Sequence, residues 1–223
     1  GALSGTQFMR NTKGDVLIDP ATGLPVAGTD RYYPIADRLP KFTLGMVNKF
    51  NYKDWYLTFL WDWRKGGDVL NGLDYNMYTL GMSTKTLNRE DPRVIRGVLK
   101  DGLENSENPT INHIAVTPYT SSAYYFTNIE PGMFVERNIY TMRLRDITLS
   151  YRLPKRLTRF LGERSSLKAF FTATDLVMFT NYTGLDPESN SNTTGIGGMG
   201  GYGIDFGNMA RPKGFNLGVN LQL

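Results

Sequence analysis

The chain has 223 residues, of which 40% are hydrophobic and 21% charged, and its formal net charge is +4. This composition is typical of a folded protein and argues against a disordered chain. Acidic and basic residues are interleaved without a long basic block, so no nucleic-acid partner is indicated, and the absence of cysteine excludes a disulfide framework and thiol chemistry.

The first segment, residues 1–41, shows turn signals in place of a periodic pattern. The runs PATGLP (20–25) and YYP (32–34) are rich in the residues that favour turns. The N-terminus lacks the charged start, apolar stretch and cleavage site of a signal peptide, and it has no initiator methionine. We therefore expect a loop here, and a chain that begins inside a longer protein.

Residues 42–65 predict a hairpin of two long strands. Apolar residues recur at every second position of the first strand, with Val47 as the exception: Phe42, Leu44, Met46, Phe50 and Tyr52. The second strand repeats this pattern with Trp55, Leu57, Phe59, Trp61 and Trp63. Period-two alternation indicates strands with one apolar and one polar face, and the intervening Lys53-Asp54 pair predicts a tight turn.

Residues 66–138 show no comparable strand and are predicted to form one long connection. A strand-turn-strand segment follows at 139–177. Its first strand, IYTMRLRDITLSYRL, changes phase between Leu144 and Ile147, which predicts a β-bulge at Arg145-Asp146. The run LPKRLTRFLGE that follows predicts a short helical turn from Pro154 to Gly162.

The last two segments are a second long loop, residues 178–210, and a closing strand, residues 211–223. The closing strand ends in KGFNLGVNLQL, where one face carries Phe215, Leu217, Val219, Leu221 and Leu223. Short and long connections therefore alternate along the chain. This alternation predicts an all-β fold made of strands of a transmembrane antiparallel β-barrel with long external loops.

Strand lengths and aromatic spacing agree with a membrane barrel. A spanning strand needs about 9–11 residues. Trp55 and Trp63 share a face and would lie ~20 Å apart in height in a tilted strand, near the two aromatic girdles. Five strands are fewer than the ~8 of the smallest closed barrels, so further strands must lie outside this chain. A soluble β-sandwich would also show alternation and remains the alternative fold.

In a barrel, the charged residues on the polar strand faces would line the lumen, because a charge facing lipid costs about 2–4 kcal/mol for Arg or Lys. The predicted lumen-facing charges are Lys49, Asp62, Arg64, Arg143 and Arg145.

Four runs of the sequence resemble the SusC/RagA-type TonB-dependent outer-membrane transporters, in the C-terminal portion of that family. They are LPKFTLGMVNKFNYKDWYLTFLWDWRKGG (39–67), RLRDITLSYRLPKRL (143–157), TDLVMFTNYTGLDPES (174–189) and RPKGFNLGVNLQL (211–223). The run NYTGLDPE after a strand is the most specific of these features, and the resemblance covers most of the chain from about residue 20.

The resemblance implies a barrel of about 22 strands in the outer membrane of a Gram-negative bacterium, with a plug domain outside this chain. It also implies TonB-dependent import of oligosaccharides or peptides together with a SusD-like surface lipoprotein. The end of the closing strand resembles the signal read by the outer-membrane assembly machinery, formed here by Gly218, Val219, Leu221 and Leu223. Family members commonly end in Phe, whereas this chain ends in Leu223.

Several loop residues are candidates to face the ligand or the lipoprotein: Tyr119, Tyr124, Tyr125, Tyr182, Asp186 and Glu188. Aromatic rings can stack on sugars or pack against a partner, and a polar rim can face either one. In the run DPESNSN, the alternating oxygens of Asp186, Glu188 and Asn190 resemble the start of a calcium loop. However, the glycine and the terminal glutamate of such a loop are missing, so we expect no metal there.

No enzyme is indicated. His113 is the only histidine, and no nucleophile–base pair or pair of carboxylates points to catalysis. The motif GIGGMG (195–200) matches a dinucleotide-binding fingerprint in form alone, because no strand and helix flank it. We expect no cofactor. The alternative function is that of a soluble β-rich module that binds glycans through its loop aromatics.

Overall fold

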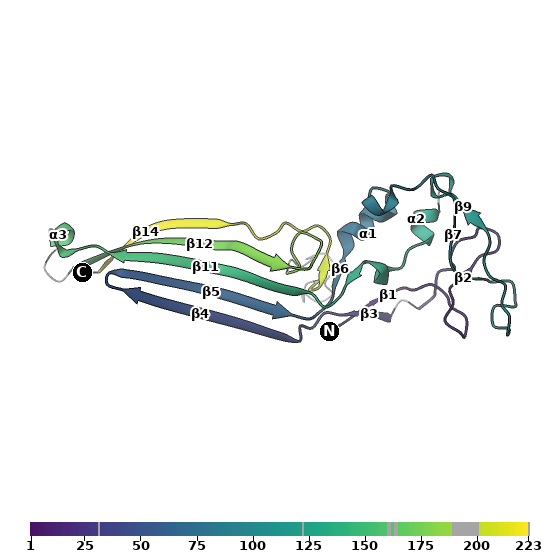
Figure 1. Ribbon diagram of the computed structural model, residues 1–223, viewed down its shortest axis with the longest axis horizontal. Coiled ribbons are helices and arrows are strands. Elements are labelled where there is room, and N and C mark those ends of the chain that lie inside the picture. Colours follow the sequence, from purple (N-terminus) through teal and green to yellow (C-terminus); the bar gives the residue numbers. More distant parts are fainter. Residues whose placement is uncertain (31, 122, 160–161, 163–164, 189–200, 223) are drawn as a thin grey trace. The chain divides into compact units, whose positions relative to one another are not determined.

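The computed structural model describes residues 1–30, 32–121, 123–159, 162, 165–188 and 201–222 (Figure 1). The chain divides into two compact units. The strand unit comprises Leu39–Gly67, Asn138–Ser189 and Met209–Leu223, and the loop unit comprises Gly1–Arg38, Asp68–Arg137 and Asn190–Asn208. Each unit is described separately below. None of the described helices is both long and apolar enough to cross a membrane.

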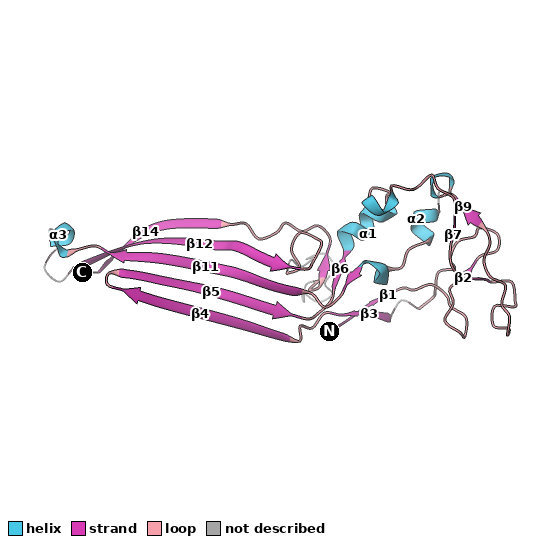
Figure 2. Ribbon diagram, viewed as in Figure 1, coloured by secondary structure: helices cyan, strands magenta, loops and turns pink. Residues whose placement is uncertain are grey.

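The strand unit is a five-stranded antiparallel sheet in the order β14-β12-β11-β5-β4 (Figure 2). Its strands are β4 (Phe42–Tyr52), β5 (Trp55–Lys65), β11 (Tyr140–Arg152), β12 (Ser166–Thr180) and β14 (Gly214–Gln222). The predicted hairpin is present: Tyr52 pairs with Trp55, and Lys53 in the turn adopts a left-handed φ of 53°. The left-handed conformation at Lys53 lets the chain reverse within two residues.

The pairing register aligns most apolar residues of the five strands on one side, with Val47 and Leu60 among the exceptions. Leu44 of β4 pairs with Trp63 of β5, and Leu57 of β5 pairs with Leu149 of β11. The row continues to the other edge, where Phe171 pairs with Leu217. Because side chains alternate along each strand, the polar residues form a second continuous face on the opposite side. We call these sides the apolar face and the polar face.

The predicted bulge in β11 is confirmed. The register shifts between Leu144 and Asp146 in the pairing of β11 with both of its neighbours. This shift leaves Arg145 as an extra residue and returns Ile147 to the apolar face, opposite Phe59. On β12, next to the bulge, Asp175 adopts a left-handed φ of 50°. The bulge therefore explains why the sequence pattern changes phase without the strand changing sides.

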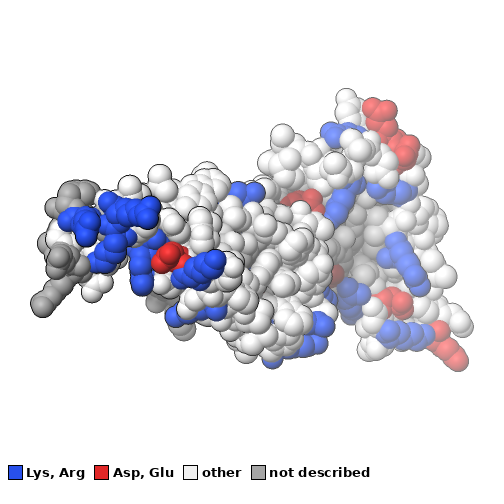
Figure 3. All heavy atoms as spheres, turned by 60° about the vertical axis from the view of Figure 1, so that its left-hand side comes forward, with Lys and Arg blue, Asp and Glu red and all other residues white. Residues whose placement is uncertain are grey.

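The connection between β11 and β12 contains the predicted helical turn, part of which, at residues 160–161, lies outside the described residues. Helix α3 (Lys155–Thr158) begins after Pro154, whose fixed φ and missing N–H suit a position at a helix N-terminus. Gly162 follows with a φ of 112°. In Figure 3 the end of the strand unit that carries α3 is turned forward, and basic side chains gather there.

The loop unit contains short strands and helices, so the expectation of a bare loop in residues 1–41 was wrong. Its first segment pairs β1 (Ala2–Gly5) with β3 (Tyr33–Asp37), and β2 (Leu17–Ile18) with β8 (Val98–Leu99). The other strands are β6 (Val69–Asn71), β7 (Arg93–Val94), β9 (Ala115–Val116), β10 (Val135–Glu136) and β13 (Ile204–Asp205).

The helices that the structure describes in the loop unit all lie in the long connection of residues 66–138, which is therefore structured. They are α1 (Gly72–Thr79), α2 (Tyr124–Thr127) and the 3₁₀ turns η1 (Thr84–Thr86), η2 (Pro118–Thr120) and η3 (Pro131–Phe134). A small hydrophobic core forms where Leu24, Val116 and Tyr124 meet. This core joins segments that lie far apart in the sequence.

Candidate functional site

Two arginines of the polar face, the buried Arg143 and the partly buried Arg145, organise a cluster of ion pairs in the strand unit. Both project from β11, and Arg143 is only 3% exposed. Arg143 donates from Nη2 to Asp186 Oδ1 at 2.8 Å and from Nη1 to Asp175 Oδ1 at 3.4 Å. Arg145 donates from Nε to Asp62 Oδ2 at 2.9 Å and from Nη2 to Glu188 Oε2 at 2.8 Å.

The cluster holds the chain that follows β12 against the sheet. Asp186 is fully buried and also accepts from the backbone N–H of Glu188 at 3.0 Å. The backbone N–H of Arg211 donates to its other oxygen at 3.5 Å. A buried carboxylate is tolerated only when it is paired and hydrogen-bonded, and the two arginines meet this need. The TGLDPE segment is thus fixed by charge pairing with β11.

This arrangement corrects part of the sequence-based interpretation. Asp186 and Glu188 were expected to form a polar rim facing a ligand or partner, but both are buried with their carboxylates turned toward arginines. A calcium site is not supported by these two residues either. Within the described ranges, no group of three or more His, Cys, Asp or Glu side chains is placed to hold a metal ion. Asn190 and the glycine run 195–200 lie outside the described residues.

The other predicted charges also lie on the polar face, as the alternation requires. Asp62 joins the cluster through Arg145. Lys49 pairs across the strands with Thr58, and Arg64 lies between Thr43 and Thr141 in the register. All five charged residues therefore share one face, but only Asp62, Arg143 and Arg145 are brought together in the cluster.

The apolar face is exposed although its residues are hydrophobic. On β14, Phe215 is 68% exposed and Leu217 is 79% exposed, and Val219 and Leu221 continue the row. Gly218 lies between them on the opposite face, and a Cβ there would come within 2.5 Å of the Phe170 ring. The described structure therefore gives Gly218 a packing role. Leu223 lies outside the described residues.

The predicted loop aromatics separate into buried and exposed groups. Tyr124 is 2% exposed in the core of the loop unit, and Tyr182 is buried in the strand unit, with its ring over Gly184. These two rings are therefore not free platforms for a ligand, which corrects the prediction. Tyr125 is half-buried and packs edge-on against Tyr124 with ring centroids 5.1 Å apart. Tyr119 alone among the four is largely exposed, at 71%.

Tyr125 belongs to a larger aromatic group that stabilises α1 within the loop unit. Tyr78 of α1 packs edge-on against Tyr125 at 5.3 Å and against Phe134 at 5.5 Å. Burial, together with the neighbouring Tyr124 and Tyr125, raises the pKa of Tyr78 to about 12, and Arg93 acts in the opposite direction. These rings hold the loop unit together, so their first role is packing.

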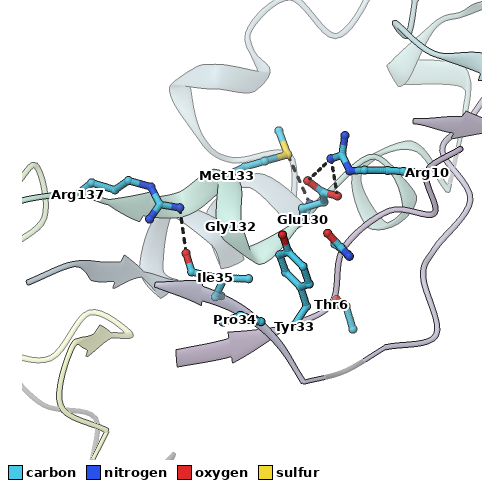
Figure 4. A pocket seen from close by; sticks show the side chains of 10 residues that line it. Thr6, Arg10, Tyr33, Pro34, Ile35, Glu130, Gly132, Met133 and Arg137 are labelled. Carbon is cyan, nitrogen blue, oxygen red and sulfur yellow. Dashed lines mark hydrogen bonds and ion pairs between the residues drawn. The ribbon is translucent and has the colours of Figure 1, made fainter. Parts of the chain in front are cut away.

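A pocket of about 410 Å³ in the loop unit was missed by the sequence analysis (Figure 4). It lies between the β1–β3 pair and η3, and its lining combines an ion pair with an aromatic ring and other polar side chains. The lining residues are Thr6, Gln7, Arg10, Tyr33, Pro34, Ile35, Glu130, Gly132, Met133 and Arg137. The only sequence signal near it was the YYP turn, because the other walls come from segments far away in the chain.

No family model matches the chain. Two curated proteins of Formosa agariphila are similar to it. TonB-dependent receptor P3 is 25% identical over 194 residues, which is 84% of this chain and 17% of that protein. TonB-dependent receptor P26 is 25% identical over 204 residues, which is 88% of this chain and 18% of that protein. The chain thus spans less than a fifth of the length of either relative.

A solved structure of the RagAB peptide importer in an open-open state resembles the fold. The match covers 99% of this chain and 22% of the matched chain, with a TM-score of 0.50 and 15% sequence identity. At this identity the likeness concerns the fold alone. The receptor relatives and this fold agree with the family resemblance found in the sequence.

Proposed function

We propose that this chain is the C-terminal portion of a SusC/RagA-type TonB-dependent transporter and forms part of the wall of an outer-membrane barrel that imports a nutrient; the similar proteins support this proposal. One observation carries the proposal. In the strand unit the hydrophobic side chains face outward, while charged residues such as Arg143 and Asp186 are buried. A sheet with this inverted distribution fits a wall with lipid on one side and a polar lumen on the other.

The strands suit this role in length and in chemistry. They contain between 9 and 15 residues, and about 9–11 are enough to cross a bilayer. In the proposed barrel, strands within 42–65, 139–177 and 211–223 form wall, and the last of these pairs with the first strand of the barrel. Closure removes the sheet edges, whose unpaired N–H and C=O groups cannot be satisfied in lipid.

The remaining segments would lie outside the membrane. We propose that residues 1–41, 66–138 and 178–210 are external and that they contact the cargo and a SusD-like lipoprotein. The plug and the segment that meets TonB would belong to parts of the protein beyond this chain. The cargo class is an oligosaccharide or a peptide, and the chain acts as a conduit with no catalytic step. The similar proteins, named as receptors or as a peptide importer, support this assignment.

The alternative, a soluble glycan-binding module, is less well supported. A soluble sandwich would need a second layer to cover the apolar face, and about half or more of the surface of Leu44, Phe215 and Leu217 is exposed. An uncovered face of this size in water would promote aggregation.

Paired cysteine substitutions in the full-length transporter test the assignment of the faces. Leu57 and Thr58 are adjacent on β5 and point to opposite faces, and this chain has no native cysteine. In reconstituted membranes we expect Thr58→Cys to react with a water-soluble maleimide and Leu57→Cys to be protected. Protection of Thr58→Cys with free reaction of Leu57→Cys would contradict the proposal.

Import itself is tested in cells that lack the transporter gene. We expect the deletion to abolish uptake of one class of labelled oligosaccharide or peptide, and the complete gene to restore it. Uptake of every labelled cargo at the wild-type rate in the deletion strain would refute the proposed function.

A further inference from the structure

The pocket between the β1–β3 pair and η3 supports an inference about the cargo, which rests on the import function proposed above. Figure 4 shows Arg10, Glu130 and Tyr33 gathered at one end of the pocket and Arg137 at the other. These residues come from three separate segments, so the pocket exists only in the folded loop unit. Charge, free hydrogen-bonding groups and apolar surface determine which ligand the pocket can bind.

The charges that line the pocket are already neutralised. Arg10 Nη2 donates to both oxygens of Glu130, at 3.2 and 3.4 Å. Arg137 pairs with Asp68 at 3.2 Å and also donates to the carbonyl oxygen of Ile35 at 2.9 Å. A ligand with a net charge would find no unpaired counter-charge among these groups, so the pocket favours an uncharged ligand.

The carboxylate of Glu130 is fixed in place before any ligand arrives. Besides Arg10, it accepts a hydrogen bond from the backbone N–H of Phe8, whose side chain is buried. Glu130 also begins η3, where its carbonyl oxygen accepts from the N–H of Met133 at 2.9 Å. An ionised carboxylate has about four acceptor positions, so Glu130 can still accept from a ligand hydroxyl.

Three polar side chains around the Arg10–Glu130 ion pair are available to bind a ligand. Among the residues that the structure describes, the side chains of Thr6, Gln7 and Tyr33 have no hydrogen-bond partner. Together they offer two hydroxyls and a primary amide, each of which both donates and accepts. Tyr33 is 43% exposed, and its ring supplies a flat apolar surface beside them. A ligand that combines several hydroxyls with a ring that has an apolar face would match these groups.

A neutral sugar residue has these properties. Its ring C–H groups can pack against an aromatic face, and its hydroxyls can both donate and accept. We propose that the pocket is a binding subsite for a neutral sugar residue of an imported oligosaccharide. Tyr33 provides the platform, Gln7 and Thr6 bind hydroxyls, and the Arg10–Glu130 pair supplies oriented donors and acceptors. A peptide fits less well, because its charged termini would meet only neutralised groups.

Binding to the purified full-length transporter tests this assignment. The probes are neutral oligosaccharides of three to six residues with different linkages, matched oligosaccharides that contain uronic acid, and short peptides. We expect at least one neutral oligosaccharide to bind in calorimetry, with affinity reduced about tenfold or more in Tyr33→Ala and by a smaller factor in Gln7→Ala. Tyr33→Phe, which keeps the ring, should lose less than Tyr33→Ala.

Phe126→Ala is the matched control, because Phe126 is an exposed aromatic residue of the same unit that does not line the pocket. Its affinity for the neutral oligosaccharide should equal that of the wild type. Equal affinities in Tyr33→Ala and Phe126→Ala would overturn the inference. Binding of peptides or uronic acid oligosaccharides alone, or of no probe, would overturn it too.

Uptake measurements separate the failure of this inference from the failure of the proposed function. If cells import a peptide through the transporter and the Tyr33→Ala variant imports it normally, the sugar subsite is wrong and the import function stands. If deletion of the transporter leaves uptake of every labelled cargo unchanged, the import function itself is refuted.

Discussion

The strand unit and the loop unit bury opposite kinds of side chain. In the strand unit the buried set is largely polar, with Thr141, Arg143 and Asp186, and the exposed set includes Phe215 and Leu217. In the loop unit the buried set is mainly hydrophobic, as in an ordinary water-soluble domain: Phe8, Leu17, Ile18, Leu24, Val98, Leu99, Val116 and Tyr124.

The difference is the one that the proposed barrel wall requires, because the side chains that a region buries depend on the solvent around it. A hydrophobic core stabilises a unit whose outside is water. That driving force is absent in lipid, where backbone pairing and satisfied polar groups dominate. The strand unit has four long pairings between its strands and a cluster of paired charges, whereas the loop unit has short strands and a small core. In the proposed barrel the two units would therefore meet different solvents.

The largest effect is expected from removing the charge at the centre of the polar face. Arg143→Met would leave the buried carboxylates of Asp186 and Glu188 with less compensation, and loss of one partner from a buried pair costs about 3–5 kcal/mol. We expect a lower unfolding temperature for the full-length transporter. This temperature is measured as the one at which the heated barrel changes its mobility on gels.

Lys49→Met is the control for this variant, because Lys49 lies on the same face outside the cluster. It should change stability by no more than about 0.5 kcal/mol. Equal destabilisation by both substitutions would show that the cluster is not what stabilises the polar face.

A smaller effect is expected from placing a charge on the apolar face. Leu217→Arg near the middle of β14 should cost about 2–4 kcal/mol if this face meets lipid. Asn216→Arg, one residue earlier on the polar face, should be tolerated. The fraction of folded protein in the outer membrane measures both. Loss of assembly in Asn216→Arg with normal assembly of Leu217→Arg would reverse the assignment of the faces.

The smallest effect concerns the core of the loop unit. Ile18 is fully buried, so Ile18→Val should destabilise this unit by about 0.5–1.5 kcal/mol. Ile111→Val is the control, because Ile111 is exposed. Faster hydrogen exchange in β2 and β8 alone would confirm that the two units respond separately. An equal loss of protection in β11 and β12 would show that the units unfold together.

The strand unit could be predicted from the sequence because its signals are local. The alternation in residues 42–65 determined both strands and the turn at Lys53-Asp54, and the change of phase near Arg145 located the bulge. The same alternation placed Asp62, Arg143 and Arg145 on one face. It could not pair them with Asp186 and Glu188, because the return of that segment onto the sheet depends on tertiary contacts.

The loop unit was missed for the same physical reason. Its elements join residues distant in the chain, such as Leu17 with Val98 and the N–H of Phe8 with Glu130. A strand of two residues is too short to show a periodic pattern, so the sequence could not predict such contacts. The pocket lined by Tyr33 is built from three segments that are distant in the chain, so only the structure shows it. Tyr124 was misjudged because a loop aromatic and a core aromatic look alike in sequence.

The bulge in β11 also bears on how the length of this strand can vary. Adding or deleting one residue in a regular strand exchanges the two sides for every residue beyond it. Deleting Arg145 would instead leave Leu144, Asp146 and Ile147 in strict alternation. Loss of Arg145 would remove a charge from the cluster while the rest of the strand kept its orientation. The strand can therefore lose a residue here without exchanging its two faces.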